Sequence, residues 1–163
     1  MRDANKSKQQ LIEELAAARQ QIAQLEVARS ELESEEHALR ESEERHRLLV
    51  NGLPAAVWMS DREGKAVFMS PPVEQIYGYT PEEVLRGGSR IWFDRIHPED
   101  RGEVVEAYHR LFDSGDEFDR EYRIRHRNGE WIWVRDRAIA RLHEHGESYA
   151  YGFFTDISDR RRV

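Results

Sequence analysis

The amino-acid sequence predicts an α+β fold: a five-stranded antiparallel sheet with helices on one face, preceded by a long N-terminal coiled-coil helix. Two observations lead to this prediction. Residues 1–45 contain no glycine, proline or aromatic residue, whereas every glycine, proline and aromatic residue follows them. In the later part, β-prone runs lie at both ends of a helical stretch, an order typical of one sheet covered by helices. The chain therefore divides into a helical part and a globular part.

A heptad pattern of apolar residues indicates a coiled coil in residues 1–45. Charged residues occupy later positions of the same seam, at Arg29, Glu36 and Glu43, so the seam begins apolar and becomes charged. A single solvated helix is the alternative, but so narrow an apolar stripe gives an isolated helix little reason to fold. We therefore expect a homodimer through this seam, with the sheet face as a further contact surface. The seam residues are Leu11, Leu15, Ala18, Ile22, Leu25, Leu32 and Leu39.

The first elements of the globular part follow the end of this helix, which we expect at Asn51-Gly52. Two β-prone runs, at residues 55–61 and 64–70, are joined by a short turn whose glycine can supply a positive φ. Short helical turns come next, between caps and breakers such as Thr80-Pro81. These turns are too short to be stable without a sheet beneath them.

A longer helix and three strands complete the globular part. The helix is predicted to begin at Pro98, after His97, and to end near Gly115. Three long β-prone runs follow, and turns at Asn128-Gly129 and Gly146 join them as antiparallel neighbours. The runs cover residues 117–127, 130–142 and 147–157. Strands at both ends with helices between them leave a space between the helices and the sheet, which either side chains or a ligand can fill.

Four ordered blocks resemble the signatures of PAS sensor domains of the bacterial signalling type, as found in sensor histidine kinases and diguanylate cyclases. The blocks are FMSPPVEQIYGYTPEEVL, IHPEDR, EYRIRHRNGEWIWVRDRA and YGFFTDISDRRR. The resemblance implies a sensor domain at residues 46–157, after a coiled-coil helix at 1–45. It also implies that residues 158–163 begin a helix leading to a C-terminal effector domain of the parent protein, a kinase or a cyclase in a two-component or similar system. Many family members bind a small molecule between sheet and helices.

The resemblance also assigns a signal junction. Asp156, Ile157 and Ser158 are similar to the Asp-Ile-Thr ending of the family, with serine in place of threonine. A carboxylate at Asp156 can accept backbone amides or pair with a guanidinium, and Arg135 and Arg137 on the neighbouring strand are the candidate partners.

The ligand cannot be named from the sequence, and no cofactor is assigned. Alternation and the family layout place mainly apolar residues between sheet and helices, which favours a small apolar ligand, a planar cofactor or a core filled by side chains. The candidates are Trp58, Phe68, Ile76, Ile96, Leu111, Tyr122, Ile124, Val134 and Phe153. The four tryptophans are expected to pack in the core or on the sheet surface, or to line such a cavity.

Other functions have less support. His143-Glu144-His145 lacks a third spaced ligand for a metal site, and His109 is a heme ligand only in the alternative of a heme-binding gas sensor. The lack of cysteine excludes thiolate nucleophiles and cysteinyl flavin adducts, and no catalytic motif is present. We expect a regulatory fragment without its own catalytic site, either a ligand-responsive sensor or a ligand-free protein-interaction scaffold.

Charge and hydropathy limit the partners. The formal net charge of −7 argues against general affinity for nucleic acids, because their phosphates would be repelled. No run approaches the roughly 20 apolar residues that cross a bilayer, and the first residues lack the apolar stretch of a signal peptide. We therefore expect a cytoplasmic protein without direct membrane insertion.

Overall fold

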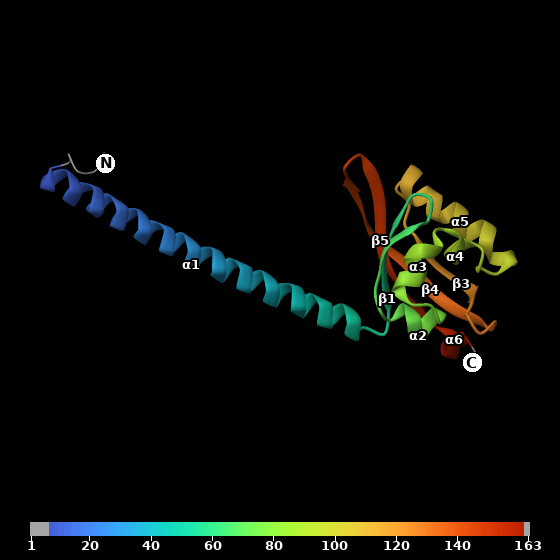
Figure 1. Ribbon diagram of the computed structural model, residues 1–163. Coiled ribbons are helices and arrows are strands. Elements are labelled where there is room, and N and C mark those ends of the chain that lie inside the picture. Colours follow the sequence, from blue (N-terminus) through green and yellow to red (C-terminus); the bar gives the residue numbers. More distant parts are fainter. Residues whose placement is uncertain (1–6, 162–163) are drawn as a thin grey trace. The chain divides into compact units, whose positions relative to one another are not determined.

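The computed structural model describes residues 7–161, and the chain divides between Arg47 and Leu48 into two units. Helix α1 covers Lys8–Gly52, so the long N-terminal helix predicted from the sequence is present (Figure 1). None of its described side chains is buried, and the leucines of the predicted seam are each about half exposed or more. Among residues 7–161, no helix is both long enough and apolar enough to cross a membrane.

The second unit contains a five-stranded antiparallel sheet, which confirms the predicted fold class. The strands are β1 Ala56–Asp61, β2 Ala66–Met69, β3 Asp119–Arg125, β4 Trp131–Glu144 and β5 Glu147–Asp156. Their order in the sheet is β2-β1-β5-β4-β3, so the last strand of the chain lies in the middle. The turns predicted at Asn128-Gly129 and Gly146 do join antiparallel neighbours.

The helices of this unit lie between β2 and β3 in the sequence, apart from the short α6 that follows β5. They are α2 Val73–Tyr77, α3 Pro81–Gly87, α4 Arg90–Phe93, α5 Pro98–Asp113 and α6 Ser158–Arg161. Figure 1 shows α3, α4 and α5 together on one side of the sheet. Helix α5 begins as predicted: the His97 ring accepts a hydrogen bond from the Glu99 amide, and Pro98 occupies the first turn, where no amide bond is lost. The N-terminus of α3 carries a capping box between Thr80 and Glu83.

The core fills the space between the helices and the inner face of the sheet. Alternation along the strands decides which side chains enter it: Tyr122 and Ile124 of β3 are fully buried, while Glu121 and Arg125 on either side of this pair are exposed. A bulge in β4 after Ala138 shifts the register against β5. At this point β4 passes so close to Gly152 that an added Cβ would overlap the carbonyl oxygen of Arg137.

Candidate functional site

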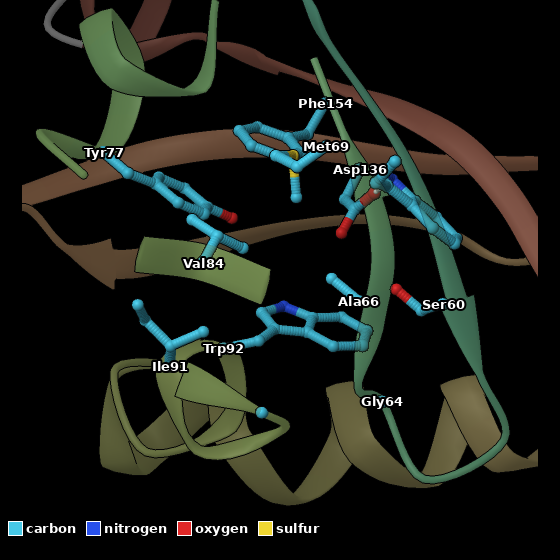
Figure 2. A pocket seen from close by; sticks show the side chains of 12 residues that line it. Ser60, Gly64, Ala66, Met69, Tyr77, Val84, Ile91, Trp92, Asp136 and Phe154 are labelled. Atoms are coloured by element: carbon cyan, nitrogen blue, oxygen red, sulfur yellow. Dashed lines mark hydrogen bonds between the residues drawn. The ribbon is translucent and has the colours of Figure 1, made fainter. Parts of the chain in front are cut away.

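A cavity of about 30 Å³ lies between the short helices and the inner face of the sheet (Figure 2). Its wall is formed by residues of strands β1, β2, β4 and β5, of helices α2, α3 and α4, and of two turns. The lining residues are Trp58, Ser60, Gly64, Ala66, Met69, Tyr77, Val84, Gly88, Ile91, Trp92, Asp136 and Phe154. Most of these side chains are aliphatic or aromatic. Figure 2 shows the Asp136 carboxylate and the hydroxyls of Tyr77 and Ser60 directed toward the same space, beside the ring of Trp92. The cavity is therefore an apolar chamber with a few convergent polar groups, which is the composition of small-molecule sites.

Asp136 is the charged residue of this chamber, and its carboxylate is held by aromatic hydrogen-bond donors. It is 2% exposed. Its Oδ1 accepts a hydrogen bond from Nε1 of Trp58 at 2.8 Å, and its Oδ2 accepts one from the hydroxyl of Tyr122 at 2.8 Å. That hydroxyl in turn accepts a hydrogen bond from Nε1 of Trp92 at 2.8 Å. The chain Trp58–Asp136–Tyr122–Trp92 therefore joins three strands of the sheet to helix α4.

Burial dominates the electrostatics of this network. Desolvation raises the pKa of Asp136 from 3.8 to about 7, although the hydrogen bonds from Tyr122 and Trp58 lower it and the charge of Asp119 adds a smaller increase. Desolvation and the neighbouring carboxylate also raise the pKa of Tyr122 well above its usual range, so this hydroxyl keeps its proton. No lysine, arginine or histidine is among the residues that line the chamber. An ionised Asp136 thus has hydrogen-bond donors but no cationic partner.

Aromatic stacking fixes one wall of the chamber. The ring of Tyr77 stacks on Phe154 with 4.5 Å between centroids, and burial raises the pKa of the Tyr77 hydroxyl. The guanidinium of Arg95 lies 4.9 Å from the Tyr77 ring and 4.5 Å from the Tyr79 ring. Arg95 also donates to the carbonyl oxygens of Ile91 and Arg125. Arg95, which does not line the chamber, thus holds Tyr77 against the sheet.

The predicted signal junction binds the backbone of Trp133 on β4. The amide of Ile157 donates to the carbonyl oxygen of Trp133 at 2.8 Å, and the Trp133 amide donates to Oγ of Ser158 at 3.0 Å. Oδ1 of Asp156 accepts a hydrogen bond from the Ser158 amide at 2.9 Å, so this carboxylate orders the turn between β5 and α6. The guanidinium of Arg161 lies 4.2 Å from the Trp133 ring.

Two arginines expected at the junction have other partners. Arg135 makes a two-point ion pair with Asp119, and Nε of Arg137 lies 3.5 Å from the same carboxylate. Both strands beside β4 are direct neighbours, but Asp119 lies opposite Arg137 and so shares the outer face with the two arginines, whereas Asp156 lies opposite the inward-facing Val134. Glu121 of β3 instead forms ion pairs with Arg160 and Arg161 of α6, the short helix that follows the junction.

The residues proposed for a ligand pocket fall into three places. Trp58 lines the chamber. Six others are buried in the core without lining it: Ile76, Ile96, Leu111, Tyr122, Ile124 and Val134. Phe68 is 46% exposed, and Phe153 is only partly buried because its neighbours Gly152 and Phe154 take the inward positions of β5. Of the four tryptophans, Trp58 and Trp92 line the chamber, whereas Trp131 is 46% exposed.

The histidines considered for heme or metal lie elsewhere. His109 is on α5, with its ring beside Phe93, and it is not among the residues that line the chamber. Because no histidine lines the chamber, its residues do not fit a histidine-ligated heme. His143 interacts with Ser148 across the β4–β5 hairpin, at 3.1 Å. Among residues 7–161, no group of three or more metal-ligating side chains is found.

Asp136 is the functional candidate that the sequence reasoning missed. Its signal was present in the alternation of β4, because Val134 and Asp136 share the inward face of the strand. A charged residue at an inward strand position is uncommon and needs a partner or a function. The many aspartates and glutamates at caps and turns of this chain obscured that signal.

The family model of the PAS fold matches residues 66–153, which is more than half of the chain. The chain belongs to the PAS family. This match confirms the resemblance drawn from the four sequence blocks, and the PAS fold accounts for the five-stranded sheet with helices on one face. The matched residues form a sensor domain, and no catalytic domain is identified in the chain.

Solved PAS domains of signalling proteins have the same fold. A sensory box histidine kinase/response regulator from Burkholderia thailandensis is 30% identical, with a TM-score of 0.57 over 72% of this chain and 88% of that one. The N-terminal domain of a diguanylate cyclase with a PAS/PAC sensor from Marinobacter aquaeolei is 26% identical, with a TM-score of 0.57 over 66% of this chain and 98% of that one. The chain is thus a PAS sensor domain of the type found in bacterial signalling proteins.

A curated relative is much longer than this chain. An uncharacterized protein of Sinorhizobium fredii is 35% identical over 135 residues, which is 82% of this chain but 16% of that protein. The chain therefore spans about a sixth of the length of this relative, and it corresponds to one module of a larger protein there.

Proposed function

We propose that this PAS domain is the input module of a bacterial signal-transduction protein, in which occupancy of the Asp136 chamber changes the junction at Asp156–Ser158 and thereby an effector. The observation that carries the proposal is that one strand holds both sites. β4 places Asp136 in the chamber and, three residues earlier, binds the junction through both backbone groups of Trp133.

The coupling follows from the geometry of a strand. Asp136 and Trp133 point to opposite faces of the sheet, because they are three residues apart. A ligand that displaces Asp136 therefore shifts or twists β4 on the inner face, and the same movement changes the backbone groups of Trp133 that hold Ile157 and Ser158. A population shift between two arrangements of β4 would transmit the signal without unfolding the sheet.

We also propose that α1 joins two protomers as a coiled coil. The seam leucines and isoleucine of α1 are 47–62% exposed in the single chain, and a helix of 45 residues without a buried side chain gains stability from a partner helix. A dimer would bring two sensor domains into one assembly, so that both protomers act on one effector.

Hydrogen exchange tests the coupling between chamber and junction. Asp136→Asn replaces the carboxylate with an amide of similar shape and leaves the outer face of the sheet unchanged. We expect faster exchange at the amide of Ile157, which donates to Trp133, in this variant. Glu130→Gln, an exposed carboxylate beside β4, is the matched control and should leave this amide unchanged. Equal protection of Ile157 in all three proteins would refute transmission through β4.

A ligand-free interaction scaffold is the second candidate function. Exposed apolar side chains on the sheet, among them Phe68, Trp131 and Ile139, favour it because such groups are common at protein contacts. Denaturing extraction of the purified protein with mass spectrometry separates the two functions. A stoichiometric small molecule supports the sensor and contradicts the scaffold.

A further inference from the structure

We propose that the Asp136 chamber selects a small organic cation with N–H donors, of the alkylammonium class, and rejects carboxylates. This inference deepens the proposed function and rests on it, since it names the ligand class of the same chamber. It follows from three features of the wall: an unneutralised carboxylate, aromatic faces and small size.

The carboxylate has unused acceptor capacity. Each oxygen of Asp136 accepts one hydrogen bond from the protein, from Trp58 and from Tyr122, whereas a carboxylate offers about four lone-pair sites. Neither donor carries a charge. An ammonium group can therefore add both a charge-assisted hydrogen bond and the missing positive charge. An anionic ligand would instead meet Asp136 in a chamber whose lining residues include no cation.

Aromatic faces suit the same ligand. Trp58 and Trp92 lie 6.5 Å apart between ring centroids, and both line the chamber together with Tyr77. Indole faces attract cations, and the attraction grows when water is excluded. Met69 and Val84 supply apolar contacts for a short alkyl chain.

The volume limits the size of the ligand. A cavity of about 30 Å³ has room for about two water molecules or a ligand of a few heavy atoms. Methylammonium and ethylammonium are of this size. Fatty acids, flavins and heme are far larger than the chamber as the structure has it.

Binding of a cation should depend on pH, because only ionised Asp136 attracts it. The other titratable groups around this carboxylate are Tyr77 of α2, Tyr108 of α5 and Tyr122 of β3, and burial raises the pKa of each, so all three stay neutral between pH 6 and 8. Asp119 of β3 is the charged group that acts on it. With a pKa near 7, Asp136 is about a tenth ionised at pH 6 and nine-tenths at pH 8. Alkylamines remain protonated over this range.

Indole N–H signals in a proton–nitrogen NMR spectrum provide the assay. Methylammonium and ethylammonium chloride are titrated into the full chain at constant ionic strength, with sodium acetate, sodium propionate and acetamide as the anionic and neutral comparisons. We expect a saturable shift of the Trp58 and Trp92 signals with the ammonium salts only, and about tenfold weaker apparent affinity at pH 6 than at pH 8. Trp131 does not line the chamber and makes no contact with the junction, so its signal serves as the internal control.

Two variants test separately the role of the Asp136 carboxylate and the role of the free volume in the chamber. Asp136→Asn should weaken ammonium binding at least tenfold, whereas Glu130→Gln should bind as the original chain does. Ala66→Val adds two methyl groups inside the chamber and should also abolish the shift, with Asp136 intact. The Trp131 and Trp133 signals show whether each variant is folded.

Three outcomes would overturn the ligand class. They are a saturable response to acetate, propionate or acetamide without one to the ammonium salts, equal ammonium affinity in Asp136→Asn, and no response to any probe at pH 8. None of them refutes the proposed sensor function, which the hydrogen exchange of Ile157 tests without any ligand. If ammonium salts bind but the exchange of the Ile157 amide is unchanged in Asp136→Asn, the ligand class of the chamber stands and transmission through β4 is refuted.

Discussion

Replacing Asp136 should change how the stability of the domain depends on pH. Burial raises the pKa of this carboxyl to about 7 in the folded chain, against 3.8 for an unperturbed aspartate. The folded state therefore binds the proton more tightly than the unfolded state. The stability that this proton contributes is fully present below the unfolded pKa and is lost as the pH rises through the folded pKa. A difference of about three pH units corresponds to about 4 kcal/mol, at about 1.36 kcal/mol per unit.

Asp136→Asn removes this titration, because the amide is neutral at every pH. We expect the free energy of unfolding of the variant, minus that of the original chain, to rise by about 4 kcal/mol between pH 4 and pH 8. The amide has one acceptor oxygen in place of two and cannot accept hydrogen bonds from both Trp58 and Tyr122 as the carboxylate does. This loss lowers the free energy of unfolding of the variant by about 1–3 kcal/mol at all pH values and leaves the pH dependence of the difference unchanged.

Urea unfolding monitored by tryptophan fluorescence, in steps between pH 4 and 8, measures this difference. Salt bridges and hydrogen bonds lower the pKa of Glu83, Asp100 and Asp119, so these carboxylates produce the opposite trend, but they do so in both proteins and largely cancel. A difference that stays constant within about 1 kcal/mol would refute the reasoning, because it would mean that ionised Asp136 is not penalised by burial.

Two further predictions concern packing and assembly. Gly152→Ala should lower the free energy of unfolding by about 3 kcal/mol in the same urea assay, because the new Cβ would overlap the backbone of β4. Gly102→Ala is the control: its Cβ meets nothing within 4 Å, so it should not destabilise the domain. Equal effects of the two substitutions would contradict this account. Leu25→Glu places a charge in the seam and should convert the dimer into a monomer of 19.3 kDa, as measured by light scattering. Val27→Glu, two residues away and outside the seam, should leave the dimer intact. A monomeric original chain would exclude the coiled coil.

Local signals were sufficient to predict the five strands and the two long helices. The hairpin turns at Asn128-Gly129 and Gly146, and the start of α5 at Pro98, follow from rules that involve a few neighbouring residues. Short turns also make β3, β4 and β5 neighbours, whereas the pairing of β1 with β5 joins distant segments and does not follow from such rules.

The chamber depends on contacts that such rules do not describe. Alternation indicates that Tyr122 and Val134 face inward, but whether an inward side chain borders an empty space depends on how α2, α3 and α4 pack over the sheet. Trp92 enters the chamber from α4, a helix of four residues for which the sequence gives no periodic signal. The partner of Arg135 likewise required the register of β3 against β4.

The long β4–β5 hairpin has a consequence for solubility. β3 pairs with β4 only as far as Arg137, so in the described part of the chain the rest of β4 has a strand partner on one side alone. Open edges of this kind invite pairing with strands of other molecules and aggregation. The bulge after Ala138 and the polar residues Arg141, His143 and Glu144 oppose such pairing. The end of this hairpin is therefore a poor place for additional apolar residues, and changes that straighten the bulge or remove these polar side chains should promote fibrous aggregates before they alter the sensor core.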